Sequence, residues 1–206
     1  MKNFCEIKNV VFDLGGVLLE WNPEKIVAQA FDNPSTGNLI MREIFLHPDW
    51  LKFDGGELTE SQAIRFFAQK TGRSEEDIEK LMNVYRNSLS PFPESIDFFY
   101  ELKKEKFKLF CASNIHPSIF RKLTKSHQFL KEFDGVLVSG KIGILKPNPA
   151  FYKHLIDAYA LSPQETVFID DKPENVDAAV LLGMHGIVFN TVKNCRRRLH
   201  ELRGIV

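Results

Sequence analysis

Cysteine is scarce in this 206-residue chain, and its three copies form no recognisable pattern. The number of cysteines is odd, and no CxxC pair is present; they are Cys5, Cys111 and Cys195. This argues against a disulfide framework and favours a reducing compartment. The six histidines lack the HxH and HExxH spacings of zinc sites, so a zinc protein is not expected.

An excess of charge of one sign is also absent. The 27 Lys and Arg residues balance the 27 Asp and Glu residues, so no general electrostatic attraction to nucleic acid or membrane is expected. The one basic run, residues 193–198, continues at helical spacing and is interpreted as the solvated face of a terminal helix. No apolar run approaches the roughly 18 residues that a transmembrane helix needs.

The N-terminal segment has some features of a signal peptide. Lys2 and Lys8 precede an apolar stretch, but Asp13 falls inside that stretch and a glycine pair follows it. An ionised carboxylate is unfavourable in the apolar region of a signal peptide, and no small-residue cleavage site is clear. We therefore expect a core strand here and a cytoplasmic protein.

Short apolar runs and helical patterns alternate along much of the chain. The runs cover residues 7–12, 108–112, 135–138, 166–169 and 186–189. Buried parallel strands have this appearance, and intervening helices supply their crossovers. The pattern predicts an α/β fold, a Rossmann-like open parallel sheet of about five strands with helices on both faces. Gly183 is expected to stop the helix that follows Asp171.

Residues 20–92 interrupt this alternation with helical patterns only. Pro23 can open one helix, Thr59 and Gln62 form a capping-box signature, and Ser74 can cap another helix. About 70 residues exceed what a crossover needs. We expect residues 20–92 to form a helical cap domain, with 1–19 and 93–206 as the catalytic core.

Acidic residues end two of the predicted strands. Asp13 follows the first run, and Asp170 and Asp171 follow the fourth. The carboxyl ends of parallel strands meet at one edge of the sheet, where α/β folds bind ligands. Clustered carboxylates repel each other unless a cation joins them, and Mg²⁺ is the economical choice. A helix-capping role for these acids is the simpler alternative.

Two further segments carry polar groups that suit a phosphate. Ser113 and Asn114 follow the second strand and can donate to phosphoryl oxygens, although an Asx or Ser turn would look the same. Lys146 lies between a glycine loop and a proline-led helix, where its ammonium group can neutralise Asp13 and an incoming phosphate. A solvated lysine is the alternative.

Taken in order, the Asp, Ser-Asn, Lys-Pro and Asp-Asp segments are similar to the motifs of the haloacid dehalogenase (HAD) superfamily of hydrolases. The resemblance spans nearly the whole chain, and the insert resembles the cap of the helical-cap subfamily. Three segments look closest to sugar-phosphatase-like members: residues 12–18, Trp50 with residues 55–57, and residues 170–175.

The resemblance implies a role for each motif residue. Asp13 would be the nucleophile and a Mg²⁺ ligand, together with the Gly15 carbonyl oxygen. Asp171 would be the acidic metal ligand and Asp170 its neighbour, acting through water. Ser113 and Asn114 would hold the phosphoryl group, and Lys146 would bridge it to the nucleophile.

One position departs from the family pattern. Most phosphatases that this chain resembles carry an aspartate two residues after the nucleophile, as general acid. Here that position is Gly15. General acid catalysis contributes about 10²–10⁴-fold in rate. Either the metal and a good leaving group suffice, or another residue supplies the proton, or turnover is slow.

The expected function is Mg²⁺-dependent hydrolysis of a small phosphorylated metabolite, with a sugar phosphate implied by the resemblance. Two alternatives remain open. One is a metal-independent haloacid dehalogenase, which the acid pair disfavours because it would repel a substrate carboxylate. The other is a low-turnover phosphate-binding or regulatory protein. The sequence fixes neither the physiological substrate nor the choice between monomer and homodimer. Trp21, Trp50 and Phe53 are candidates to line the pocket or to pack inside the cap.

Overall fold

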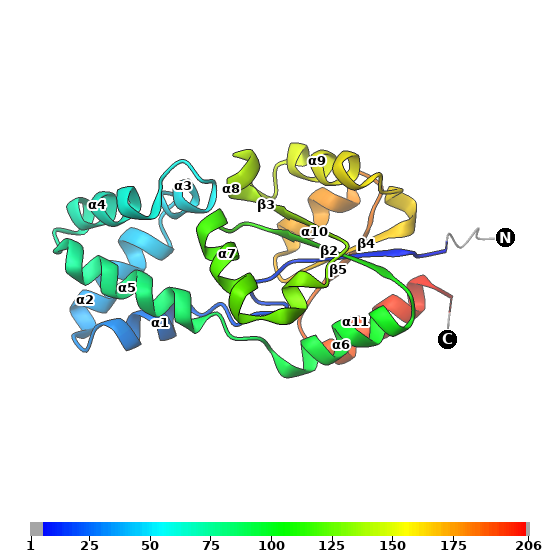
Figure 1. Ribbon diagram of the computed structural model, residues 1–206, viewed down its shortest axis with the longest axis horizontal. Helices are drawn as coiled ribbons and strands as arrows, with labels where there is room; N and C mark the ends of the chain where they lie inside the picture. Colours follow the sequence, from blue (N-terminus) through cyan, green and yellow to red (C-terminus); the bar gives the residue numbers. More distant parts are fainter. Residues whose placement is uncertain (1–5, 205–206) are drawn as a thin grey trace.

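The computed structural model describes residues 6–204 and contains one five-stranded parallel sheet (Figure 1). The strand order is β3-β2-β1-β4-β5, which places β1 in the centre. The strands are β1 (Asn9–Phe12), β2 (Lys108–Ser113), β3 (Gly135–Val138), β4 (Thr166–Asp170) and β5 (His185–Val188). The predicted α/β fold class is therefore confirmed, and each strand lies within two residues of its predicted run.

Helices cover both faces of the sheet. Alternate side chains of β1 divide between two apolar clusters: Val11 packs in the first, and Val10 and Phe12 pack in the second. The first cluster is covered by α9 (Pro149–Tyr159) and α10 (Pro173–Val180). The second is covered by α6 (Pro93–Lys104), α7 (Pro117–Ser126) and α11 (Val192–Leu202). Short turns complete the core: η2 (Gln128–Lys131), α8 (Ser139–Ile142) and η3 (Pro163–Glu165).

The predicted stop at Gly183 is confirmed. Helix α10 ends at Val180, and Gly183 closes the following turn with φ 89°. The Gly183 N–H donates to the Val180 carbonyl at 2.9 Å, and the Met184 N–H donates to the Ala179 carbonyl at 3.3 Å. These two bonds form a Schellman motif with the glycine at C′.

Residues 23–88, between β1 and α6, fold into helices, which lie at the left of Figure 1. The predicted start signals are confirmed. Asn22 caps the helix that Pro23 opens, Thr59 and Gln62 make both bonds of a capping box, and the Ser74 side chain accepts from a backbone N–H. The elements are α1 (Pro23–Ala30), α2 (Pro34–Ile40), η1 (Met41–Phe45), α3 (Trp50–Asp54), α4 (Glu60–Thr71) and α5 (Glu75–Ser88). We interpret residues 20–92 as a cap, and these boundaries stay a prediction.

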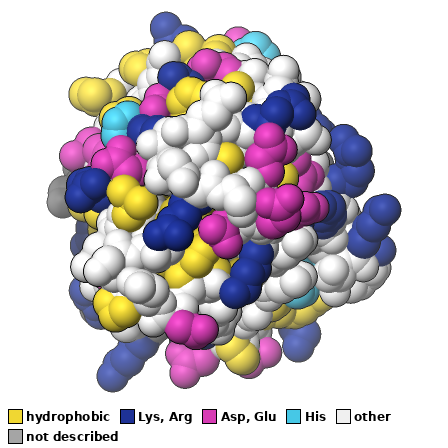
Figure 2. Space-filling model, turned by 90° about the vertical axis from the view of Figure 1, so that its left-hand side faces the viewer, with side chains coloured by type: hydrophobic (Ala, Val, Ile, Leu, Met, Phe, Trp, Pro, Cys, Tyr) yellow, Lys and Arg dark blue, Asp and Glu magenta, His cyan; other side chains and the backbone are white. Residues whose placement is uncertain are grey.

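Figure 2 shows the end of the molecule formed by this helical segment. Cationic and anionic side chains are interspersed there, with scattered apolar atoms between them. Within residues 6–204, every helix is too short or too polar to span a bilayer. Cys111 and Cys195 are buried free thiols, whereas Cys5 lies outside the described residues.

The tip of α3 contacts the core beside the strand ends. The Ser139 hydroxyl donates to the Asp54 carbonyl oxygen at 2.6 Å, and the Phe53 ring stacks on His116 with centroids 4.5 Å apart. A Cβ added to Gly56 would meet the Gly140 carbonyl oxygen at 2.5 Å, so the two backbones touch. These contacts fix one edge of the cap over the core.

Candidate active site

The carboxyl ends of β1, β2 and β4 bring the predicted motif residues together. Phe12 is in register with both Cys111 and Ile169, so Asp13, one residue further, is level with Asp170. Ser113 ends β2, at the same edge of the sheet. The Asp13 backbone N–H still donates to the Ile169 carbonyl at 2.9 Å, which fixes the direction of its side chain.

Lys146 is a buried cation between two buried carboxylates. Its Nζ lies 2.9 Å from Asp13 Oδ1 and 2.6 Å from Asp170 Oδ2. Burial acts to lower the pKa of Lys146, but the two carboxylates outweigh burial and raise it. The lysine therefore stays charged, and the alternative of a solvated lysine does not apply.

The Asn114 side chain holds the Lys146 backbone in place. Its Nδ2 donates to the Lys146 carbonyl at 3.0 Å, and its Oδ1 accepts from the Lys146 N–H at 2.8 Å. One N–H of the Asn114 amide remains for a ligand. Ser113 is buried and lines the same cavity as Asp13. The predicted roles of both residues toward a phosphoryl group stay predictions.

Asp171 is half-buried and lines the cavity beside the buried Asp13 and Asp170. Oxygen atoms of Asp13, Asp170 and Asp171 lie within 4.8 Å of one another. Burial and the neighbouring carboxylates of Asp13 and Asp170 raise the pKa of Asp171 to about 6. Gly16, at φ 76°, approaches so closely that a Cβ there would meet Asp171 Oδ2 at 2.6 Å. The absence of a side chain at Gly16 thus leaves room for the Asp171 carboxylate.

Asp170 is already satisfied by protein donors. Besides Lys146, its oxygens accept from Asn175 Nδ2 at 2.9 and 3.0 Å and from the Lys172 N–H at 2.9 Å. Helix α10 has Lys172 at its N-cap, so neither acid of the pair caps it. Asp170 is suited to anchoring Lys146, and direct ligation of a metal by Asp170 stays a prediction.

The donor set fits a divalent cation. Three carboxylates cluster here, Lys146 pairs with two of them, and Asp13 Oδ1 is buried with no well-directed hydrogen bond despite its ion pair. Burial raises the pKa of Asp13, Lys146 opposes that rise, and Asp170 adds to it. Oxygen ligands in a carboxylate-rich site suit Mg²⁺. Gly15 lines the same cavity, and ligation of a metal by its carbonyl oxygen stays a prediction.

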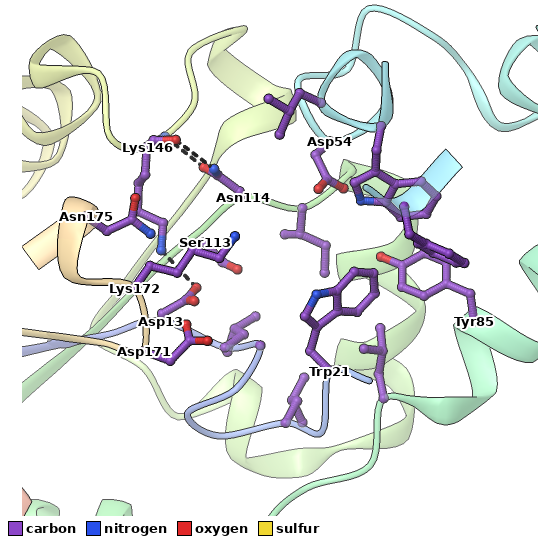
Figure 3. Close-up of a pocket in the computed structure, with 18 of the residues that line it drawn as sticks. Asp13, Trp21, Asp54, Tyr85, Ser113, Asn114, Lys146, Asp171, Lys172 and Asn175 are labelled. Carbon is purple, nitrogen blue, oxygen red and sulfur yellow. Dashed lines mark hydrogen bonds and ion pairs between the residues drawn. The ribbon is translucent and has the colours of Figure 1, made fainter. Parts of the chain in front are cut away.

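A cavity of about 350 Å³ opens between these strand ends and the helical cap (Figure 3). Its floor is polar and its cap side is largely apolar. The predicted Trp21 and Trp50 line the cavity, whereas Phe53 packs against the core. Further lining residues from residues 20–92 are Phe45, Leu46, His47, Pro48, Leu51, Asp54, Tyr85 and Leu89.

Sequence reasoning missed these lining residues, and Asp54 is the acidic one among them. It ends α3, is only 8% exposed, and points into the cavity opposite Asp13 in Figure 3. Burial raises the pKa of Asp54 to about 8, although a hydrogen bond from Trp50 and the charge of Lys172 oppose this. One signal was available in the sequence. Asp54 follows a phenylalanine and directly precedes a glycine pair, and Asp13 also follows a phenylalanine and precedes a glycine pair by one residue.

Known proteins share this arrangement of the chain. A family model described as haloacid dehalogenase-like hydrolase matches residues 7–183. Sesquiterpene phosphatase astK of Aspergillus oryzae is 31% identical over 200 residues, which are 97% of this chain and 96% of that protein. A structure described as a predicted HAD-like family hydrolase from Porphyromonas gingivalis has a TM-score of 0.75 at 27% identity, covering 95% of this chain and 98% of that chain.

A second solved structure shares the fold. It is the HAD family enzyme bt-2542 of Bacteroides thetaiotaomicron in complex with magnesium and inorganic phosphate. Its TM-score is 0.75 at 24% identity, with 90% of this chain and 96% of that chain covered.

Proposed function

The chain belongs to the haloacid dehalogenase-like hydrolases and acts on phosphate esters, and from this premise we propose that it is a Mg²⁺-dependent phosphatase of small phosphate monoesters. The observation that carries the proposal is the position of Asp13. It lies at the floor of a cavity with Lys146 on one side and the Asp171 carboxylate on the other. The family that the motifs suggested is confirmed by the family model over residues 7–183 and by the 31% identical relative.

In this proposal Asp13 attacks phosphorus and forms an aspartyl phosphate, which water then hydrolyses. Lys146 stabilises negative charge on the equatorial oxygens, and the Ser113 hydroxyl and Asn114 amide donate to them. Asp170 keeps Lys146 oriented through its short ion pair. Mg²⁺, when held by Asp13, Asp171 and the Gly15 carbonyl, would neutralise charge on the phosphoryl group.

The experiment is phosphate release from a generic aryl phosphate. Activity is expected with Mg²⁺ and is expected to vanish in excess chelator or in Asp13→Asn. The exposed Asp157 on α9 supplies a matched control, since Asp157→Asn makes the same change away from the site. Full activity in Asp13→Asn would reject the mechanism.

The dehalogenase alternative predicts a different result. That reaction would form a carbon ester on Asp13 and would need no metal. The pKa of Asp171 is raised by burial and by its acidic neighbours, and once ionised this carboxylate would repel a substrate carboxylate. Halide release that survives the chelator would favour this alternative.

The leaving group is the finer part of the proposal. The cap side of the cavity carries two indole rings, a phenol ring and several leucines. Trp21 lies 6.0 Å from Trp50 and 5.5 Å from Tyr85 between ring centroids, so these side chains form one aromatic wall. Such a wall favours an alcohol with a large apolar surface. The sesquiterpene phosphatase relative supports this preference.

A substrate panel tests the leaving group. Prenyl or aryl phosphates are expected to have a higher kcat/KM than hexose phosphates, and Trp21→Ala is expected to reduce that advantage. A hexose phosphate with the higher kcat/KM would instead support the sugar-phosphate prediction drawn from the family resemblance.

A further inference from the structure

We propose that Asp54, supplied by the helical cap, is the proton donor to the leaving oxygen. It would take the role of the aspartate that related phosphatases carry at the position of Gly15. The inference rests on the proposed phosphatase function. It assigns a catalytic residue outside the four motifs, and it explains how a chain with glycine at position 15 can cleave esters of poor leaving groups.

The position of Asp54 suits the geometry of phosphoryl transfer. The attacking and leaving oxygens lie roughly in line on opposite sides of phosphorus. Asp13 attacks from the floor, so the leaving oxygen faces the cap. Asp54 lines the same cavity from the cap, and its carboxyl group points toward the space above Asp13 (Figure 3).

The backbone of Asp54 is held by the core. Its carbonyl oxygen accepts from the buried Ser139 hydroxyl at 2.6 Å, and that hydroxyl also accepts from the Ile115 N–H at 3.0 Å. The adjacent Phe53 ring stacks on His116 at an interplanar angle of 9°. A proton donor needs a fixed distance to the reacting atom, and these contacts provide one although Asp54 belongs to the cap.

The surroundings of Asp54 keep its proton in place at neutral pH. The carboxyl group is nearly enclosed, and burial is the largest influence that raises its pKa. Asp13 raises it further from the core, while the Trp50 indole and Lys172 act in the other direction. Tyr85 faces it from α5, and burial raises the pKa of that phenol, so Tyr85 stays neutral.

The proposed steps balance in protons and charge. Asp13 forms a bond to phosphorus while the bond from phosphorus to the leaving oxygen breaks, and the Asp54 proton moves to that oxygen to give the free alcohol. Water then attacks the aspartyl phosphate and gives a proton to the Asp54 carboxylate. Asp13 leaves as a carboxylate, inorganic phosphate is released, and both groups are restored.

His47, which also lines the cavity from the cap, is less suited to this step. Its Nδ1 atom lies 3.1 Å from Asp49 Oδ2 and 3.2 Å from the Asp49 backbone nitrogen, so Asp49 already occupies that ring nitrogen. Its side chain is 41% exposed, whereas Asp54 is buried and therefore keeps its proton more readily.

The test compares two leaving groups in Asp54→Asn, which keeps the shape of the side chain. With an alkyl phosphate, kcat/KM, which reports the steps up to departure of the alcohol, is expected to fall about 10²–10⁴-fold, because alkoxide needs a proton to leave. With p-nitrophenyl phosphate, whose phenolate leaves without a proton, kcat/KM is expected to fall less than about tenfold. Asp54→Glu is expected to recover part of the alkyl rate, and an infrared band of a protonated carboxyl at pH 7 is expected to vanish in Asp54→Asn.

Equal losses on both substrates, or no loss on either, would overturn the assignment of Asp54. A failure of the proposed function is seen separately. It would appear as wild-type protein without phosphatase activity on either ester, or as an active Asp13→Asn variant, before any variant of Asp54 is compared.

Discussion

At the scale of single residues, the site depends on one lysine that two carboxylates share. The Lys146 side chain is 1% exposed and the Asp170 side chain 0%, so neither charge is solvated by water. Such a pair contributes little net stability, yet removing one partner leaves the other charge buried and uncompensated. Lys146 thus serves the fold and the chemistry at once.

Lys146→Met is expected to lower the free energy of unfolding by about 3–5 kcal/mol, because Asp13 and Asp170 lose their shared cation. Urea denaturation measures the change. Lys153→Met, at an exposed position of α9, is the matched control and should leave stability nearly unchanged. Equal stabilities of the two variants would contradict the account of Lys146.

The raised pKa of Asp54 makes a prediction about stability and pH. The folded pKa is about 8, against an ordinary value of 3.8. Between these values the folded state holds a proton that the unfolded state has released. The burial of protonated Asp54 therefore does not reduce the free energy of unfolding below pH 3.8. As the pH rises from 3.8 toward 8, this residue lowers the free energy of unfolding by up to about 1.4 kcal/mol per pH unit.

Asp54→Asn removes this dependence. Relative to the wild type, the variant is expected to gain stability as pH is raised from 5 to 8, which thermal unfolding at a series of pH values measures. Parallel stability curves for the two proteins would show that Asp54 is ionised in the folded state.

At the scale of elements, the strands could be predicted but their distant contacts could not. The strand ends were visible because apolar runs stop at Asp13, Ser113 and Asp170, and parallel pairing carries such ends to one edge. The hydrogen bonds between Asn114 and Lys146 join residues 32 positions apart in the chain. Asp54 is buried where the end of α3 bonds to Ser139, which is 85 positions away. Local patterns contain no record of such contacts.

The junction of α3 and α8 gives an element-scale prediction. Gly56 and Gly72 both have positive φ, 75° and 66°, so alanine is strained at either position. Only at position 56 would the new Cβ also meet backbone, the Gly140 carbonyl oxygen at 2.5 Å; at Gly72 nothing lies within 4 Å.

Gly56→Ala is therefore expected to lose more stability than Gly72→Ala, by about 1–3 kcal/mol. Gly56→Ala should also lose activity, because the new Cβ forces α3 away from Gly140 and this displaces Asp54. Thermal unfolding and phosphate release measure the two effects. Similar behaviour of the two variants would mean that the junction does not position the cap.

At the scale of the whole molecule, a parallel sheet and a helical segment enclose one cavity whose charges do not balance. Oxygen atoms of three carboxylates lie within 4.8 Å of one another, whereas Lys146 pairs with two of them and Lys172 lines the same cavity, so a bound cation would offset the remaining negative charge. A ligand that binds only the folded state stabilises it by an amount set by its concentration, about 2.7 kcal/mol at 100 times Kd.

Mg²⁺ is accordingly expected to raise the Tm of the wild type and to have little effect on Asp171→Asn. Asp177→Asn, at an exposed position of α10, is the matched control and should respond as the wild type does. An equal rise of Tm in Asp171→Asn would place the ion elsewhere.

The central claim is that Asp13 becomes phosphorylated during turnover. The most direct measurement is mass spectrometry of peptides from protein quenched in acid while it hydrolyses p-nitrophenyl phosphate with Mg²⁺. The account predicts a phosphoryl group on the peptide containing Asp13, lost on treatment with hydroxylamine. Steady phosphate release with the phosphoryl group on another residue, or undiminished release by Asp13→Asn, would contradict it.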